Sequence, residues 1–362
     1  MEKQKNILIC PLDWGLGHAT RCVPIIYKFI EKGANVIIGA DKRPLAFLKN
    51  EFPSLKVIQF PGFEVRYPEK GSMALRMIYY LPQIIKNIRK ERELLDKIIS
   101  DYDIDMVVSD NRYGLYNRKA KCVFITHQLN IQSSGWLKIF GYFLKCINSH
   151  YIRKYDECWV PDFNRGISIS GELSKSTGRF GKLFFIGILT RFNKSIIVSC
   201  ENKNHFDLLV ILSGPEPQRS IFENILLEQL KANNQLKVVI VRGITDSDEE
   251  TKISENIKMV SHMPTLKLMQ AITDAGIVIC RPGYSSIMDL VSFGKKAIFV
   301  PTPGQTEQEY LAKYFLKKNI FYAMTQKRFS LAKALKKSSF YPGIKVNMDS
   351  KVLDERIHFL LS

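Results

Sequence analysis

Residues 274–314 constrain the fold most strongly, because two apolar runs of strand length flank a helix pattern. Residues 275–280 form the first run, and Arg281-Pro282-Gly283 ends it. Apolar side chains then recur at helical spacing until Gly294, which suits a helix end, and a second apolar run occupies 297–300. Parallel α/β sheets are built from such strand–loop–helix–strand units.

The same alternation fills the rest of the chain in two series. Apolar runs typical of strands occupy 6–12, 35–40, 56–60, 106–109, 122–126, 158–160, 183–186, 208–212, 238–242 and 257–260. A polar, charged stretch at 191–205 separates the two series. We therefore expect an α/β protein with two doubly wound, Rossmann-like domains facing a cleft. The N-terminal domain covers 1–192 and the C-terminal domain 193–362, whose last helix, near 352–361, is a candidate for packing back on the first domain.

The composition indicates a folded protein with an anionic partner. A chain of 362 residues with 46% hydrophobic residues can form two globular domains. Its formal net charge of +18 favours a phosphorylated substrate, an anionic membrane surface or nucleic acid as partner. The seven scattered cysteines include no CxxC pair, the N-terminus is polar, and no uncharged apolar run has the length of a spanning helix. We expect a cytoplasmic protein without a secretory leader.

A loop with two glycines joins the first strand to the first helix, where a phosphate-binding loop would lie. It carries Gly15, Gly17, His18 and Arg21, with Thr20 where a dinucleotide fingerprint has its third glycine. At a helix start the dipole disfavours the charged form of His18, so the imidazole can stay neutral and accept a proton. The alternative is a histidine that only hydrogen-bonds a neighbouring loop.

The loop at the start of the second series is a candidate for binding a phosphate. Ser213 and Gly214 follow a strand directly, and Arg219 lies a few residues downstream. A purely local alternative exists, because Ser220-x-x-Glu223 matches the capping-box pattern at a helix start.

The helix pattern after Gly283 has the same two interpretations. Its start suits an anionic ligand, and Asp289, one turn into the helix, is placed to bind hydroxyls. The alternative is a helix capped by Ser285 or Ser286, since Ser286-x-x-Asp289 is also a capping box. Polar residues then follow the next strand, where open α/β sheets bind ligands, namely Gln305, Glu307, Gln308 and Glu309.

No metal site is expected. Two acidic pairs resemble the metal-holding pair of some sugar transferases, but Asp103-x-Asp105 precedes its strand and Asp246-x-Asp248 lies in an acidic run typical of a solvated loop. No His/Cys cluster has zinc spacing. Two polar loops after strands instead provide further candidate bases, Asp110 and His127.

Two helix patterns are candidates for contact with an anionic bilayer. Residues 136–155 carry one apolar, aromatic-rich face, formed by Trp136, Phe140, Phe143, Leu144 and Ile147. The second pattern, at 74–100, is rich in basic residues, among them Arg76 and a cluster at 86–92, and Arg153 and Lys154 lie at the end of the first. The apolar face equally fits an ordinary core helix. Nucleic acid is not expected, because no motif of a nucleic-acid-binding fold occurs.

Together these loops resemble the nucleotide-sugar glycosyltransferases of the GT-B type. The sequence is most similar to the family 28 group, which includes the N-acetylglucosaminyltransferase of peptidoglycan lipid-intermediate synthesis. The motifs that carry the resemblance are 15–18, 213–214, 281–289 and 305–309. It departs from the family at Asp289, where relatives usually have Glu, and in a glycine-poorer 213–216 loop.

The resemblance implies an inverting, metal-independent transfer without a cofactor, from a UDP-sugar such as UDP-N-acetylglucosamine to a lipid-linked or other envelope acceptor. The C-terminal domain would bind the donor, with His262 and Met263 at the uracil, Asp289 at the ribose, Ser213, Gly214, Tyr284 and Ser285 at the diphosphate, and Gln305 and Glu309 at the sugar. His18 would be the base, with Asp110 and His127 as alternatives. Gly15, Gly17, Arg21, Arg219, Arg281 and Gly283 complete the expected substrate contacts. A cytoplasmic protein peripheral to the inner membrane face would fit such an acceptor.

Two other function classes fit the same fold. A UDP-sugar 2-epimerase would convert its substrate without an acceptor, and needs acid–base residues that only His18, Glu307 and Glu309 are placed to supply. A non-catalytic sugar-nucleotide-binding subunit would bind UDP without turnover.

Overall fold

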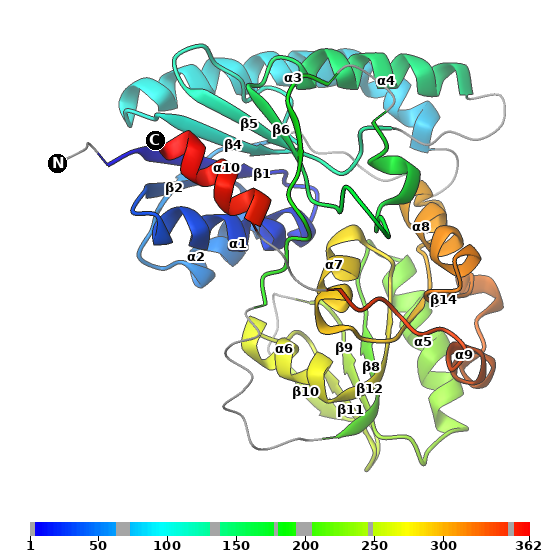
Figure 1. Cartoon of the computed structure of the whole chain (residues 1–362). Coiled ribbons are helices and arrows are strands. Elements are labelled where there is room, and N and C mark those ends of the chain that lie inside the picture. The colour runs from blue at the N-terminus through cyan, green and yellow to red at the C-terminus, as the bar shows by residue number, and fades with distance from the viewer. Residues whose placement is uncertain are drawn as a thin grey trace. The chain divides into compact units, whose positions relative to one another are not determined.

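The computed structural model of the chain describes residues 4–62, 73–130, 138–176, 180–192, 205–244, 249–346 and 351–362 (Figure 1). The chain divides into two compact units, which we call unit 1 (residues 1–191 and 348–362) and unit 2 (residues 192–347). Each unit contains a sheet with helices packed against it, so the expected α/β fold with two Rossmann-like domains is confirmed.

Unit 1 is built on a parallel sheet of seven strands among its described residues, in the order β3-β2-β1-β4-β5-β6-β7. The strands are β1 (Asn6–Pro11), β2 (Asn35–Ala40), β3 (Lys56–Gln59), β4 (Met106–Asp110), β5 (Lys121–Ile125), β6 (Glu157–Val160) and β7 (Leu183–Phe185). The helices are α1 (Leu16–Glu31), α2 (Lys42–Glu51), α3 (Met73–Asp101), α4 (Lys138–Ile152) and α10 (Lys351–Leu361), with a 3-10 turn η2 (Gly171–Leu173).

Unit 2 has a second sheet in the order β10-β11-β9-β8-β12-β13-β14, parallel except for β10. The strands are β8 (Phe206–Ile211), β9 (Val238–Val241), β10 (Glu250–Lys252), β11 (Ile257–Val260), β12 (Ala275–Cys280), β13 (Ala297–Phe299) and β14 (Tyr322–Ala323). The helices are α5 (Gln218–Lys231), α6 (Thr265–Asp274), α7 (Tyr284–Phe293), α8 (Thr306–Lys317) and α9 (Leu331–Ser338), with a 3-10 turn η4 (Gln326–Arg328).

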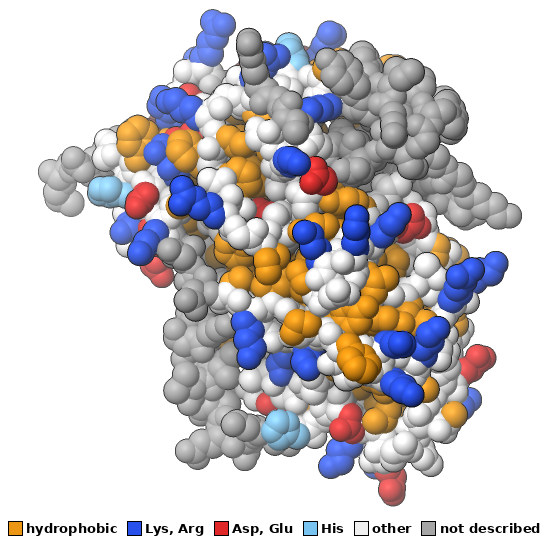
Figure 2. Space-filling view, turned by 45° about the vertical axis from the view of Figure 1, so that its right-hand side comes forward, with side chains coloured by type: hydrophobic (Ala, Val, Ile, Leu, Met, Phe, Trp, Pro, Cys, Tyr) orange, Lys and Arg blue, Asp and Glu red, His pale blue; other side chains and the backbone are white. Residues whose placement is uncertain are grey.

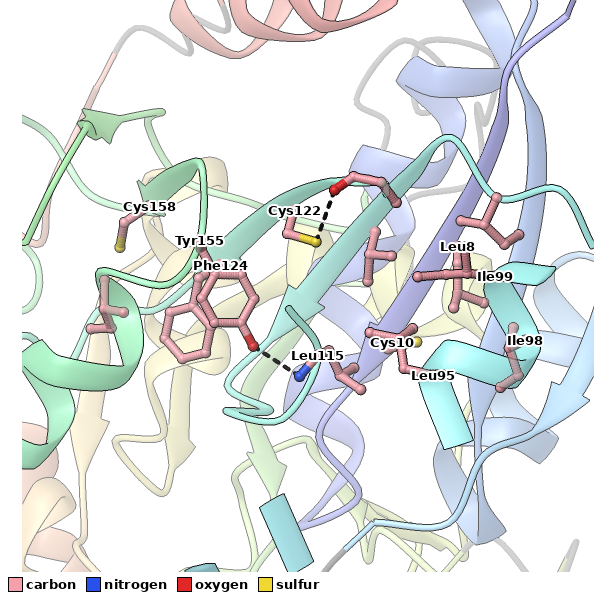
Figure 3. Packing of buried hydrophobic residues seen from close by; sticks show 14 of the residues in the cluster. Leu8, Cys10, Leu95, Ile98, Ile99, Leu115, Cys122, Phe124, Tyr155 and Cys158 are labelled. Atoms are coloured by element: carbon pink, nitrogen blue, oxygen red, sulfur yellow. Dashed lines mark hydrogen bonds between the residues drawn. The ribbon is translucent and has the colours of Figure 1, made fainter. Parts of the chain in front are cut away.

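The core of unit 1 packs the sheet against α3 and the segment after α4 (Figure 3). Cys10 of β1 and Phe124 of β5 are fully buried, as expected of parallel strands covered on both faces. Tyr155 carries the only hydroxyl group among the residues labelled in Figure 3, and this group makes two hydrogen bonds. Its Oη accepts the Leu115 N–H at 3.1 Å and donates to the Arg112 carbonyl at 2.6 Å. The polar atom is therefore buried without the cost of a missing hydrogen bond.

Two predicted helix starts were wrong. The N-cap of α7 is Gly283, without a side-chain cap bond, so neither Ser285 nor Ser286 caps this helix. Likewise α5 begins at Gln218 after Pro217, and its Ser220 N–H donates to the Glu216 carboxylate at 3.2 Å instead of to Glu223 in a capping box. The predicted end of α7 is confirmed, because Gly294 is the C-cap in the left-handed conformation, with φ of 62°.

The C-terminal helix α10 packs within unit 1, next to α1. Lys28 of α1 forms an ion pair with Asp354. Arg356 forms a stronger anchor, since its guanidinium pairs with Glu157 of β6, whose side chain is 3% exposed, and lies 4.2 Å from the ring centre of Phe184. The chain end thereby covers the first sheet.

Some predictions concern residues outside the described part of the chain. They are the acidic pair Asp246 and Asp248, Trp136, and the side chains of Arg76, Phe140, Phe143 and Leu144. Among the described residues, no helix is both long and apolar enough to cross a bilayer.

Replacing Arg356 tests the anchor of α10. Arg356→Ala leaves the Glu157 carboxylate buried without its cationic partner and with the Trp159 indole N–H still donating to it, which should lower the free energy of unfolding by on the order of 3 kcal/mol. The matched control is Lys121→Ala, which removes an ion pair to Asp156 whose side chains are 66% and 42% exposed, and which should cost under about 1 kcal/mol. Urea denaturation measures both, and equal losses would contradict this role of Arg356.

Candidate functional site

The carboxyl edge of the first sheet brings together three residues that are distant in sequence. The strand order reverses between β1 and β4, and Pro11 at the end of β1 pairs with Asp110 at the end of β4. In open α/β sheets such a reversal leaves a crevice in which ligands bind. His18 enters it from the first turn of α1, and His127 from the loop after β5.

Arg21 lies at the centre of this group. Its Nε donates to Oδ2 of Asp110 at 2.5 Å, and its terminal Nη2 also donates to Oδ1. The same Nη2 lies 2.8 Å from Nδ1 of His18, and Nη1 lies 3.3 Å from Nδ1 of His127. We call these four residues the His18 cluster. Arg21, Asp110 and His127 are at most 3% exposed, whereas the His18 side chain is 20% exposed and is the most accessible of the four.

The burial of the His18 cluster changes its proton affinities. Burial lowers the pKa of His18 below its ordinary value, the Arg21 charge lowers it further, and Asp110 only partly offsets both. Burial alone would raise the pKa of Asp110, but Arg21 and His18 outweigh it and lower that pKa to about 2. At neutral pH the cluster thus contains a neutral imidazole beside a buried carboxylate, as a general base requires.

Nδ1 of His18 has two competing partners. It lies 3.2 Å from Oδ1 of Asp110, which only accepts, and 2.8 Å from a nitrogen of Arg21, which only donates. If Nδ1 carries the proton and donates to Asp110, Nε2 is an unprotonated base. If Nδ1 instead accepts from Arg21, Nε2 carries the proton and can only donate. This tautomer decides whether His18 removes a proton or positions an acceptor.

The loop after β4 is held by a buried arginine that the sequence analysis did not single out. Arg112 is 1% exposed; its Nε donates to Glu91 of α3 at 2.9 Å, and its terminal nitrogens donate to the carbonyls of Phe60 and Pro61 at 2.9 Å each. These bonds fix the chain directly after Asp110.

The two glycines of the first loop lie at the start of α1. Gly15 is the N-cap, with φ of 152°, and the Gly17 carbonyl accepts the Thr20 hydroxyl at 3.0 Å. Asp41, directly after β2, is the N-cap of α2 and accepts from Gln59 at 3.1 Å.

The predicted donor residues of unit 2 follow strands that end at one edge of its sheet. Ile211 and Cys280 pair in register, and Cys280 also pairs with Phe299. The loops 213–214, 281–285 and 301–305 therefore begin side by side. The strand order reverses between β8 and β12, so Ser213, Gly214, Gly283, Tyr284 and Ser285 flank the second crevice.

The side chains around this second crevice differ in accessibility. Ser213 and Gly214 are exposed, Ser285 is half-buried, and Tyr284 is 4% exposed. Gly214 has φ of 102°, which favours glycine, and a Cβ there would lie 3.2 Å from the Thr302 hydroxyl. The loop backbone is thus open to a ligand.

Arg281, expected to bind substrate, lies inside this edge. It is 1% exposed, and its guanidinium donates to the carbonyls of Val300 and Gln218 at 2.9 Å and to Oε1 of Gln326 at 2.6 Å. Burial lowers its pKa to about 10. These bonds join three loops, so Arg281 holds the loops of this edge in place.

Arg219 is likewise engaged locally. Its Nε donates to the Glu216 carboxylate at 2.9 Å, and a terminal nitrogen approaches the Arg242 carbonyl at 3.4 Å. Its side chain is 18% exposed. The ion pair closes the loop between β8 and α5.

The loop after β13 is held by the first turn of α8. Gln308 accepts the Thr302 N–H at 2.8 Å, and Glu309 accepts the Gly304 N–H at 2.9 Å. Gln305 is the N-cap of α8 and half-buried. The sequence analysis placed Gln305 and Glu309 at the donor sugar, whereas the structure shows one carboxylate oxygen of Glu309 bonded within the loop.

The remaining predicted contacts also belong to unit 2. His262 and Met263 lie shortly after β11 and are half-buried. Asp289 lies in the middle of α7 and is also half-buried. Among the described residues, no group of three or more His, Cys, Asp or Glu could hold a metal ion. Asp105 accepts the Asn6 N–H at 2.8 Å, a bond at the amino end of β1.

The C-terminal part of the chain is similar to a known family of domains. Residues 208–353 match the glycosyltransferase family 28 C-terminal domain. An uncharacterized glycosyltransferase of Methanosarcina mazei is 24% identical over 319 residues, which cover 84% of this chain and 82% of the relative.

Two further comparisons extend over nearly the whole chain. The UDP-N-acetylglucosamine–N-acetylmuramyl-(pentapeptide) pyrophosphoryl-undecaprenol N-acetylglucosamine transferase of Francisella philomiragia is 24% identical over 345 residues, 91% of this chain and 86% of the relative. The crystal structure of the glycosyltransferase SnogD from Streptomyces nogalater has the same fold, with a TM-score of 0.62, 11% identity and full coverage of both chains.

The depressed pKa of Asp110 predicts a pH-dependent contribution to stability. The folded protein binds this proton less tightly than the unfolded chain, whose pKa is near 3.8, so the contribution is complete above that pH and is lost as the pH falls toward 2. The stability difference between wild type and Asp110→Asn should therefore shrink by about 1 kcal/mol from pH 5 to pH 3. Urea denaturation at both pH values measures this, and a constant difference would show that the folded state does not favour the Asp110 carboxylate.

Proposed function

We propose that this chain, a glycosyltransferase of the GT-B fold that is similar to family 28, transfers a sugar from a UDP-sugar to a lipid-linked or other cell-envelope acceptor. N-acetylglucosamine is the first sugar to test, because the Francisella philomiragia relative is named for UDP-N-acetylglucosamine and an undecaprenol-linked acceptor. The transfer would invert the anomeric centre and need no metal ion. Such an acceptor implies work at the inner membrane face.

The strand-order reversal in the sheet of unit 2 is the observation that supports the donor assignment. The exposed backbone of Ser213 and Gly214 and the start of α7 lie at the strand-order reversal, inside the segment that matches the family 28 domain. Backbone N–H groups at a helix start stabilise phosphate oxygens and the charge that grows on a leaving diphosphate. His262 and Met263 would contact the uracil, Asp289 the ribose, and Gln305 with Glu309 the sugar.

The His18 cluster would supply the base. Nε2 of His18 takes the proton of the acceptor hydroxyl while that oxygen bonds the anomeric carbon and the bond from that carbon to the UDP oxygen breaks. The Asp110 carboxylate stabilises the imidazolium that forms, as a buried carboxylate does for other histidine bases. Arg21 keeps that carboxylate ionised. Arg21 would serve the reaction through Asp110 rather than by contact with substrate.

A nucleotide panel tests the donor. UDP and one UDP-sugar should raise the stability of the protein by about 2.7 kcal/mol at a hundred times the dissociation constant, equally with and without EDTA, as measured by thermal unfolding. Gly214→Ala should weaken this effect. The control Gly166→Ala, also at a positive φ of 83° but with no atom within 4 Å of an added Cβ, should not. Stabilisation by NAD(H) alone would contradict the proposal, as would conversion of the UDP-sugar without any acceptor.

Two substitutions at His18 test the base. His18→Ala should lower kcat by a factor of about 10²–10⁴ and leave the dissociation constant of UDP unchanged, because general base catalysis contributes that much. His18→Gln should be equally impaired, since an amide can donate a hydrogen bond but cannot take the proton. Substantial activity in His18→Gln would instead show that His18 positions the acceptor as a donor, and an equal loss of UDP binding would contradict both roles.

A further inference from the structure

The amino edge of the unit 2 sheet, opposite the second crevice, gathers the ends of two helices. Helix α8 starts after β13 and α9 after β14, and both run back along the sheet beside β14 (Figure 1). The chain after α9 then crosses this edge, because the Gly343 N–H bonds the Ile320 carbonyl at 2.9 Å just ahead of β14. A Cβ at Gly294 would lie 3.5 Å from Cγ of Lys345, which places that side chain beside the end of α7.

The same edge is rich in exposed basic side chains. Residues 310–346 contain nine Lys and Arg and no Asp or Glu. Lys317 and Lys318 end α8, and Lys336 and Lys337 lie in the last turn of α9; all four are exposed, as is Lys345. On the lower part of Figure 2, which belongs to unit 2, Lys and Arg side chains surround hydrophobic ones.

One large aromatic side chain stands among these lysines. Phe340 is 74% exposed, the highest value among the large hydrophobic residues that the structure describes as exposed. Its backbone is fixed, since its N–H donates to the Lys337 carbonyl at 3.2 Å and the next ring, Tyr341, lies 5.4 Å from that of Tyr322. We call Lys317, Lys318, Lys336, Lys337, Lys345 and Phe340 the lysine–phenylalanine surface.

We propose that the lysine–phenylalanine surface docks unit 2 on an anionic lipid bilayer. Lysines close to an anionic bilayer are attracted by its negative surface charge, and an aromatic ring can enter the headgroup region between them. The apolar side of α9 does not take part, because Leu331 and Ala334 are buried in the core. The contact is therefore electrostatic, with Phe340 as its single inserted side chain.

A structural explanation accounts for only part of this surface. Lysines in the last turn of a helix stabilise its dipole, which is sufficient reason for Lys317, Lys336 and Lys337. It does not explain Lys345, the lack of any acid over 37 residues, or a phenylalanine left in water. A bilayer uses all three features, whereas nucleic acid would need only the charges.

The proposal goes beyond the glycosyltransferase activity and does not depend on it. Because the surface is at the amino edge of the sheet, the carboxyl edge with Ser213 and Gly214 stays open when unit 2 is docked. It also differs from the basic stretch of α3 that the sequence analysis singled out, so the two surfaces can be tested separately.

Cosedimentation of the full chain with vesicles tests the proposal. Wild type should bind vesicles of phosphatidylcholine with phosphatidylglycerol, bind phosphatidylcholine alone weakly, and lose affinity as salt is added. The variant Lys317→Glu/Lys336→Glu/Lys337→Glu should bind at least about tenfold more weakly. Phe340→Ser should weaken binding less but keep the salt dependence. Thermal unfolding of each variant without lipid verifies that it is folded.

The control carries the same charge change on the opposite end of the same sheet. Lys237→Glu/Lys252→Glu/Lys258→Glu alters three exposed lysines in or directly before β9, β10 and β11 and should bind vesicles nearly as wild type does. Equal losses in the two triple variants would overturn the proposal, because net charge alone would then explain binding. So would a surface variant that binds like wild type, or preferential binding of an oligonucleotide over the anionic vesicles.

Discussion

The buried ion pair of Asp110 and Arg21 is the interaction on which the first site depends. Placing two charges in a protein interior is costly, and a short, two-bonded arrangement offsets the loss of water. The pair joins the first helix to the central strand β4, and it fixes the carboxylate that faces His18. Its structural and chemical roles therefore cannot be separated by removing either member alone.

Unit 2 also buries an arginine at a strand-order reversal, but with different hydrogen-bond partners. Arg281 is almost fully buried and bonds carbonyl oxygens and an amide instead of a carboxylate. Arg281 has no paired anion among these bonds, so burial lowers its pKa and disfavours its charged form. The pKa of Asp110 is lowered for the opposite reason, because its cationic partners favour its charged form. An arginine at a sheet edge is thus no direct sign of a ligand contact.

Most strands could be predicted from the sequence, whereas several helices could not. A strand buried on both faces reads as a continuous apolar run, so 275–280 was predicted residue for residue as β12. The segment 257–260 was predicted equally well as β11, although it contains the exposed Lys258. The helix α2 was missed because it buries only Pro44 and Leu48, too few apolar residues for a periodic pattern. Capping boxes misled for a related reason: the pattern is short, and Glu216 supplied the bond instead.

The site residues could likewise be predicted only in part from the sequence. Sequence order can place a residue after a strand, and the parallel register then brings His18, Asp110 and His127 together without any further information. It cannot show which way a side chain turns, because hydrogen-bond partners come from other loops. Arg281 turns inward toward Gln326, 45 residues away in sequence, and nothing local to the Arg-Pro-Gly segment indicates that partner. The loops that form the edge can therefore be predicted from the local sequence. Only the folded structure shows which of their residues hold the loops in place and which face a substrate.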